Sequence, residues 1–187
     1  SEMCIRDRIE TIRMDPAFAD GAYYDANDGE GPHRGLALAR RLAMLTYRSG
    51  DELNQRFSRS WQSPVSPLGH GGRFAVSSYL DFHGNRFTRR FDANSYITLA
   101  EAMNSHDIGR GRGGVEEALS RASARALVLG IDTDQMFPVD GQQRIARGLR
   151  GSIDGRDAVV LRSDFGHDGF LIETEAVGEH LVRLLSD

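Results

Sequence analysis

Lysine is absent from this 187-residue chain, and all 23 of its basic residues are arginine. The absence excludes a Schiff-base lysine and the lysine of a phosphate-binding P-loop. No apolar run approaches the roughly 20 residues that a membrane-spanning helix requires, so we expect no membrane partner. The formal net charge of −4 argues against a general nucleic-acid-binding surface, and we expect no nucleic-acid partner.

Cysteine occurs once, at Cys4, so no disulfide can form within the chain. This predicts a reducing compartment and a cytoplasmic location. Residues 1–8 (SEMCIRDR) resemble a run known from artefactual ends of metagenomic gene predictions, so we expect them to be non-native. The chain contains neither a cysteine pair nor a His-Glu-x-x-His motif, and we therefore expect no metal site.

The first part of the chain, residues 9–112, is predicted to be almost entirely helical. Leu38, Leu42 and Leu45 fall at i, i+4 and i+7 and predict an amphipathic helix over Gly35–Arg48. Asp92 is well placed to cap the N-terminus of a later helix. The expected helices are Ile9–Met14, Gly35–Arg48, Asp51–Trp61, Ala75–Phe82 and Ala93–Ser105, with a surface loop over Ser63–Gly72.

The pattern changes at the glycine-rich segment Gly109–Gly114, which we interpret as a hinge. It matches G-x-G-x-x-G, but a predicted helix precedes it where a dinucleotide site requires a strand. Beyond it, helices and strands alternate, which indicates parallel β-α units and an α/β fold for residues 113–187. The expected elements are Val115–Ala122, Ala126–Ile131, Val139–Leu149, Ala158–Leu161 and Glu173–Leu185, of which the second and fourth are strands.

An acid after one strand and a histidine after the next give the order that closes an α/β-hydrolase triad. His167 is the candidate general base, and Asp134 is the candidate that orients it. Spacing alone leaves Asp132 as a competitor for the acid. No G-x-S-x-G nucleophile elbow occurs in the chain, so we expect it to be the second half of a catalyst and inactive by itself.

Several segments together resemble the homoserine O-acetyltransferase family of α/β-hydrolase-fold acyltransferases, in the C-terminal part of that family only. The most specific of them are Arg90-Phe-Asp-Ala-Asn-Ser-Tyr96 and Gly166-His-Asp168. The others are Arg34–Arg40 with Thr46-Tyr47, Ser78-Tyr-Leu80, His106-Asp107 and Asp132–Pro138. The resemblance favours Asp134 over Asp132 as the triad acid.

This resemblance implies the C-terminal portion of an α/β-hydrolase fold, preceded by a helical lid that pairs two subunits into a homodimer. It implies acetyl transfer from acetyl-CoA, a co-substrate rather than a bound cofactor, to the hydroxyl of L-homoserine. Arg40 would bind the substrate carboxylate and Asp168 its ammonium, with Tyr47 as a neighbour.

Two alternatives stay open from the sequence. One is another α/β-hydrolase-fold enzyme, either an esterase or an O-succinyltransferase that acts on serine or homoserine. The other is a non-catalytic protein that self-associates through the helical region, because a pairing surface needs no nucleophile.

Overall fold

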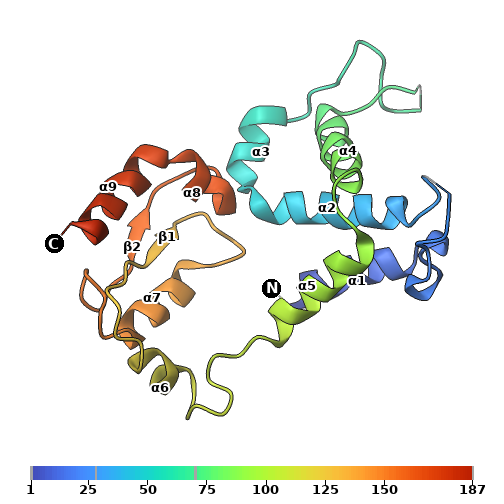
Figure 1. Ribbon diagram of the computed structural model, residues 1–187. Helices are drawn as coiled ribbons and strands as arrows, with labels where there is room; N and C mark the ends of the chain where they lie inside the picture. The colour runs from blue at the N-terminus through green and yellow to red at the C-terminus, as the bar shows by residue number, and fades with distance from the viewer. Residues whose placement is uncertain (1, 28, 70, 187) are drawn as a thin grey trace. The chain divides into compact units, whose positions relative to one another are not determined.

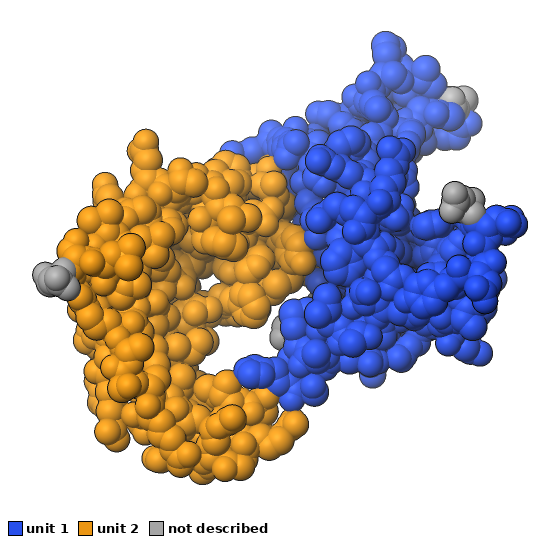
Figure 2. All heavy atoms as spheres, in the orientation of Figure 1, with its two compact units in different colours: residues 1–45, 53–106 blue, residues 46–52, 107–187 orange. Residues whose placement is uncertain are grey.

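The computed structural model describes residues 2–27, 29–69 and 71–186, and the side chains from residue 5 onward. The chain divides into two compact units, residues 1–45 with 53–106 and residues 46–52 with 107–187 (Figure 2). The short segment 46–52 therefore packs with a unit whose remaining residues lie far along the chain. Whether residues 9–112 act as a lid stays a prediction.

The first unit is helical, as predicted (Figure 1). Its elements are α1 (Glu2–Arg13), the short 3-10 helix η1 (Pro16–Gly21), α2 (His33–Tyr47), α4 (Ala75–Thr88) and α5 (Ala93–Ser105). The last residues of α2, and the first of α3 (Gly50–Phe57), belong to the second unit. Helix α4 extends six residues beyond the predicted end at Phe82, and no helix or strand forms over the described part of the predicted loop at 63–72.

Small residues on α2 make the core of this unit possible. Gly35 lies so close to α1 that an added Cβ would stand 2.5 Å from the carbonyl oxygen of Thr11. Gly84 of α4 approaches α2 in the same way, with 2.9 Å from an added Cβ to the Ala37 oxygen. The core that these close approaches enclose contains Ile9, Ile12, Phe18, Leu36, Ala39, Phe87, Ala93, Ile97 and Ala100.

The prediction of a leucine stripe as the apolar face of α2 is wrong in detail. Leu38 and Leu45 are exposed, whereas Ala39, Ala43 and Met44 are buried. Close approach of α1 and α4 selects the face with small side chains, and a periodicity that counts large apolar residues does not detect that face.

Asp92 caps α5 as predicted, accepting a hydrogen bond from the Ser95 amide at 2.7 Å. The same carboxylate also accepts hydrogen bonds from the hydroxyls of Tyr23 and Tyr24. The Tyr23 oxygen in turn accepts from the Asn94 amide at 2.9 Å. The polar residues of the Arg90–Tyr96 string thus tie the start of α5 to a loop about 70 residues earlier.

The second unit contains the predicted parallel β-α arrangement. Strands β1 (Leu129–Ile131) and β2 (Val159–Leu161) pair in parallel, with Leu129 opposite Val159. Helix α7 (Val139–Gly148) connects them, α6 (Val115–Ser120) precedes them, and η2 (Gly166–Asp168), α8 (Gly169–Ile172) and α9 (Thr174–Leu185) follow. Strand β1 is shorter than the predicted 126–131, because Ala126 makes only an isolated bridge to Ser152.

None of the helices in the described part of the chain is long and apolar enough to cross a membrane.

Candidate functional site

The two residues predicted for a catalytic pair lie in contact. Nδ1 of His167 stands 2.9 Å from Oδ2 of Asp134. The histidine follows β2 and the aspartate follows β1, so the parallel pairing of the strands brings the two side chains to one edge of the sheet. An ionised carboxylate accepts only, so the imidazole donates from Nδ1 and its Nε2 is the acceptor.

The backbone holds the Asp134 carboxylate in place. Its Oδ1 accepts hydrogen bonds from the amides of Met136 and Phe137, at 2.8 and 2.9 Å. Its other oxygen is thereby directed to His167, and the aspartate side chain is only 7% exposed. These two hydrogen bonds also close a turn before α7, so the same carboxylate holds the backbone and contacts His167.

Asp132, the competing candidate, has a different partner. Its Oδ1 accepts a hydrogen bond from the Ser163 amide at 3.0 Å. It therefore joins the ends of β1 and β2, and the structure shows no hydrogen bond or ion pair between it and the histidine. The hydrogen-bond partners therefore distinguish the two aspartates, which their spacing in the sequence could not do.

Three aromatic rings surround the His167 imidazole within this unit. Ring centroids of Tyr47, Phe137 and Phe170 lie 5.5, 5.1 and 5.8 Å from that of the histidine. Such rings restrict the imidazole and limit its contact with water. The His167 side chain stays 21% exposed, and the described residues make no hydrogen bond to its Nε2.

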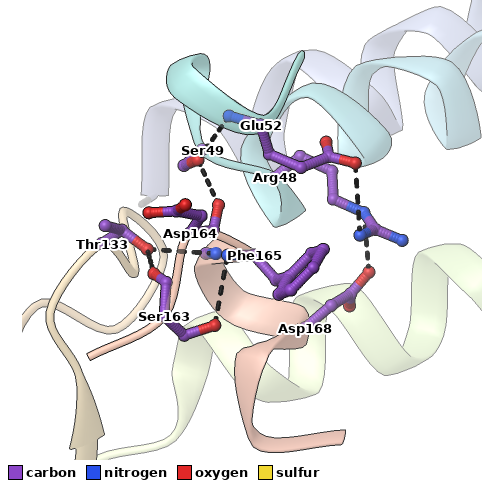
Figure 3. Close-up of polar contacts among 9 residues, drawn as sticks. Arg48, Ser49, Glu52, Thr133, Ser163, Asp164, Phe165 and Asp168 are labelled. Carbon is purple, nitrogen blue, oxygen red and sulfur yellow. Dashed lines mark hydrogen bonds and ion pairs between the residues drawn. The ribbon is translucent and has the colours of Figure 1, made fainter. Parts of the chain in front are cut away.

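The loop that carries His167 is fastened to the end of β1 by hydroxyl groups. Thr133 donates from Oγ1 to the Ser163 carbonyl at 2.5 Å and accepts from the Gly166 amide at 3.1 Å. The Ser163 hydroxyl accepts from the Phe165 amide at 3.2 Å. These bonds are drawn in Figure 3 and fix the backbone immediately before the histidine.

Segment 46–52 packs against this loop from the other side. Gly166 has φ +61°, and an added Cβ would stand 2.8 Å from the Tyr47 carbonyl oxygen and 2.9 Å from the Ser49 amide. The Ser49 hydroxyl donates to the Asp164 carbonyl and accepts from the Glu52 amide (Figure 3). Both the positive φ and the close approach require glycine directly before the histidine.

A charged cluster completes the site. Nε of Arg48 lies 3.2 Å from Oδ2 of Asp168, and Nη1 lies 3.8 Å from Oε1 of Glu52. The Arg48 side chain is 16% exposed, Asp168 24% and Glu52 9%. One mostly buried cation therefore lies between two carboxylates, one of which is the predicted ammonium-binding residue (Figure 3).

Of the predicted substrate-binding residues, Tyr47 and Asp168 lie in the second unit with the histidine, and Arg40 lies in the first. The Arg40 guanidinium carbon is 5.2 Å from the centroid of the Phe87 ring. Its role in binding a carboxylate stays a prediction.

Sequence reasoning missed the residues that hold the loop and the carboxylate. They are Arg48, Ser49, Glu52, Thr133 and Ser163, together with the aromatic Phe137 and Phe170. Thr133 and Ser163 could have been found, since each follows a predicted strand and parallel strands place such positions at one edge. Ser49 and Glu52 have the spacing of a helix capping box, and Arg48 and Glu52 are four residues apart, so their local contacts could also have been found. The contacts of Ser49 with Asp164 and of Arg48 with Asp168 could not, because those partners lie more than 110 residues away. The described residues include no group of three or more histidine, cysteine, aspartate or glutamate side chains arranged to hold a metal ion.

Parallel β-α units with a histidine and an acid at the ends of adjacent strands define part of an α/β-hydrolase fold, and solved structures bear this out. The structure of esterase E22 aligns with 99% of this chain over 50% of the esterase chain, with a TM-score of 0.83 and 20% sequence identity. The structure of the homoserine O-acetyltransferase from Bacillus anthracis aligns with 97% of this chain over 48% of the acetyltransferase chain, with a TM-score of 0.83 and 22% sequence identity. At these identities the likeness shows the fold.

Comparison with curated protein sequences shows which family this chain resembles. The homoserine O-acetyltransferase of Clavibacter michiganensis subsp. michiganensis is 68% identical over 178 residues, which are 95% of this chain and 46% of that protein. That of Leifsonia xyli subsp. xyli is 63% identical over 179 residues, 96% of this chain and 44% of that protein. No family model matches the chain. The predicted resemblance to the homoserine O-acetyltransferase family is confirmed, and the chain spans about half the length of these relatives.

Proposed function

We propose that the protein to which this sequence belongs transfers an acetyl group from acetyl-CoA to the hydroxyl of L-homoserine. The observation that carries the proposal is the 2.9 Å contact between Asp134 and His167, in a chain 68% identical to an enzyme named for that activity. Asp134 orients the imidazole and stabilises the imidazolium that forms when Nε2 takes a proton. In our proposal the nucleophile is a serine outside these 187 residues.

Two half-reactions then share one base. In the first, His167 accepts the serine proton as the oxygen attacks the thioester, and the acetyl group passes to serine as coenzyme A leaves with a proton. In the second, His167 accepts the homoserine hydroxyl proton as that oxygen attacks the acyl-serine, and the proton returns to the serine oxygen. This order predicts ping-pong kinetics.

Substrate recognition requires opposite charges, because homoserine is a zwitterion at neutral pH. We propose that Asp168 binds the ammonium and that Arg40 binds the carboxylate through its planar fork, with Tyr47 beside the histidine. The ring contact between Tyr47 and His167 supports this placement for Tyr47. We further propose a cytoplasmic homodimer paired through the helical residues 9–112, as the family resemblance implies.

A specific observation supports one alternative. The fold match to esterase E22 is as good as the match to an acetyltransferase, and hydrolysis of an acyl-serine needs the same acid–histidine pair. The alternatives differ in acceptor and donor: water for an esterase, and succinyl-CoA for an O-succinyltransferase.

The test measures thiol release by the full-length protein that carries this sequence. Acetyl-CoA and succinyl-CoA are each assayed with homoserine, with serine and without acceptor, alongside p-nitrophenyl acetate. We expect acetyl-CoA with homoserine to exceed every other pair. If homoserine does not accelerate thiol release, the proposal is wrong, and rapid ester hydrolysis alone would identify an esterase. Absence of all turnover, with a stable dimer, would favour the self-associating protein.

A further inference from the structure

Thr133 lies between the two aspartates that follow β1, and its hydroxyl makes two hydrogen bonds to the loop that carries His167. Oγ1 donates to the carbonyl oxygen of Ser163 at 2.5 Å and accepts from the amide of Gly166 at 3.1 Å (Figure 3). A hydroxyl can donate one hydrogen bond and accept two, so this single group satisfies both backbone positions. An apolar side chain of the same size can make neither bond.

The second of these bonds holds the residue directly before the histidine. Gly166 has φ +61° and begins the short helix η2, so its backbone sets the direction in which the His167 side chain leaves the loop. Glycine has the widest choice of backbone conformations of any residue, so this conformation must be fixed by its surroundings. The Tyr47 carbonyl packs against one side of Gly166, and the Thr133 hydroxyl binds its amide.

The register of the two segments relates this bond to the acid–histidine pair. Thr133 directly precedes Asp134, and Gly166 directly precedes His167. The 3.1 Å hydrogen bond therefore joins the residues just before those that make the 2.9 Å contact. The Asp134 carboxylate is itself held by two amides of its own turn, so its place is set independently of the histidine loop. The distance between imidazole and carboxylate thus depends on where that loop lies relative to residues 132–134.

We infer that Thr133 is a positioning residue for the reaction proposed above: its hydroxyl keeps the His167 imidazole at hydrogen-bonding distance from Asp134. In this role Thr133 touches neither the substrate nor the reacting atoms, and it acts through the histidine. Misplacement of a catalytic group by about 1 Å can lower a rate about 100-fold, so loss of the two hydrogen bonds should lower kcat even in a folded protein. The inference rests on the proposed role of His167 as the base, but not on the identity of the acyl donor or acceptor.

The experiment compares Thr133→Val with Thr133→Ser in the full-length protein that carries this sequence. Two rates are measured: kcat with acetyl-CoA and homoserine, and inactivation by diisopropyl fluorophosphate. In the second reaction the serine oxygen bonds to phosphorus, fluoride leaves, and His167 accepts the serine proton. We expect Thr133→Val to lower both rates about 10- to 100-fold, with KM for homoserine changed by less than about twofold. Thr133→Ser, which keeps the hydroxyl, should recover both rates to within about threefold of the unchanged protein.

Thr174→Val is the matched control, because it makes the same substitution at an exposed threonine of α9 in the same unit. It should leave both rates within about twofold. Thr133→Ala removes the two bonds without the bulk of valine and should reproduce the loss.

Unchanged rates in Thr133→Val, or an equal loss in Thr133→Ser, would overturn the positioning role. A lower urea midpoint of unfolding with both rates intact would overturn it too, because the hydroxyl would then serve stability alone. Resistance of the unchanged protein to the fluorophosphate would remove His167 as the base and this inference with it. That reagent needs neither acyl-CoA nor homoserine, so failure of homoserine to accelerate thiol release would refute the proposed acetyl transfer alone.

Discussion

Oδ2 of Asp168 lies 3.2 Å from Nε of Arg48, so the carboxylate predicted to bind the substrate ammonium already has a cationic partner. The pair is mostly buried, and Glu52 stands on the other side of the same guanidinium. Arg48 therefore acts as a positioning residue in our proposal: it holds the Asp168 carboxylate beside the histidine loop. An arriving ammonium would share this carboxylate with the arginine.

The first prediction concerns the loss of folding stability when Arg48 is replaced. Arg48→Met leaves two mostly buried carboxylates without their common cation, and loss of one partner of a buried pair is strongly destabilising. We expect the free energy of unfolding in urea to fall by about 3 kcal/mol. Arg59→Met, which removes an exposed arginine, should change it by less than about 0.5 kcal/mol. Equal small effects would show that the cluster contributes little to stability.

The second prediction separates the two aspartates after β1. In the full-length protein, Asp134→Asn should lower kcat by about 10⁴-fold, because the amide no longer selects the correct imidazole tautomer. Asp132→Asn should leave kcat within about tenfold, since Asp132 contacts the Ser163 amide and not the histidine. Steady-state kinetics with saturating acetyl-CoA decide between them. A larger loss for Asp132→Asn would refute the assignment of the triad acid.

The glycine before the histidine supports a third prediction. Gly166→Ala combines a strained positive φ with a contact of 2.8 Å to the Tyr47 carbonyl oxygen, and should lower the free energy of unfolding by about 3 kcal/mol. Gly155→Ala is matched to it, having φ +71° with no atom within 4 Å of the added Cβ. That change should cost only about 1 kcal/mol for the backbone conformation. If both variants lose the same amount, segment 46–52 is not packed against the loop as described.

A fourth prediction concerns acid sensitivity of the first unit. Burial raises the pKa of Asp92, but hydrogen bonds from Tyr23, Ser95 and Tyr24 outweigh it and hold the pKa below its ordinary value. A lowered pKa in the folded state means that the contribution to stability is present above the unfolded value of about 3.9. It is lost as pH falls through the folded pKa.

The variant Asp92→Asn tests this linkage, because asparagine can still cap α5 but does not titrate. The difference in free energy of unfolding between pH 7 and pH 3 should be smaller in this variant than in the unchanged chain. Asp25→Asn, an exposed aspartate on the same loop as Tyr23 and Tyr24, serves as the control. An unchanged pH dependence in Asp92→Asn would contradict the assigned pKa direction.

Local pattern accounts for much of the agreement between prediction and structure. The alternation of helix and strand after Gly114 predicted parallel pairing, and the segments that follow β1 and β2 contain Asp134 and His167. The preference for aspartate at helix N-caps likewise identified Asp92 as the N-cap of α5. In each case the signal lies within a few residues of the feature, where backbone geometry and hydrogen bonding are set by near neighbours.

The leucine stripe on α2 shows where such reasoning fails. Leu38 and Leu45 have the expected spacing and are nevertheless exposed, because α1 and α4 approach α2 closely at Gly35 and Ala37. The buried face of a helix depends on what packs against it. A pattern within one helix contains no information about the shape of its neighbour.

The sequence by itself determined the order of the main helices and strands and the α/β character of residues 113–187, and it left Asp132 and Asp134 as the two candidates for the acid beside His167. Only the tertiary structure decided that Asp132 joins the strand ends while Asp134 contacts His167, and that Arg48 and Ser49 support the histidine loop. The physical reason is that these contacts join residues about 30 to 115 positions apart. Their formation depends on the packing of whole elements, which local propensity does not specify.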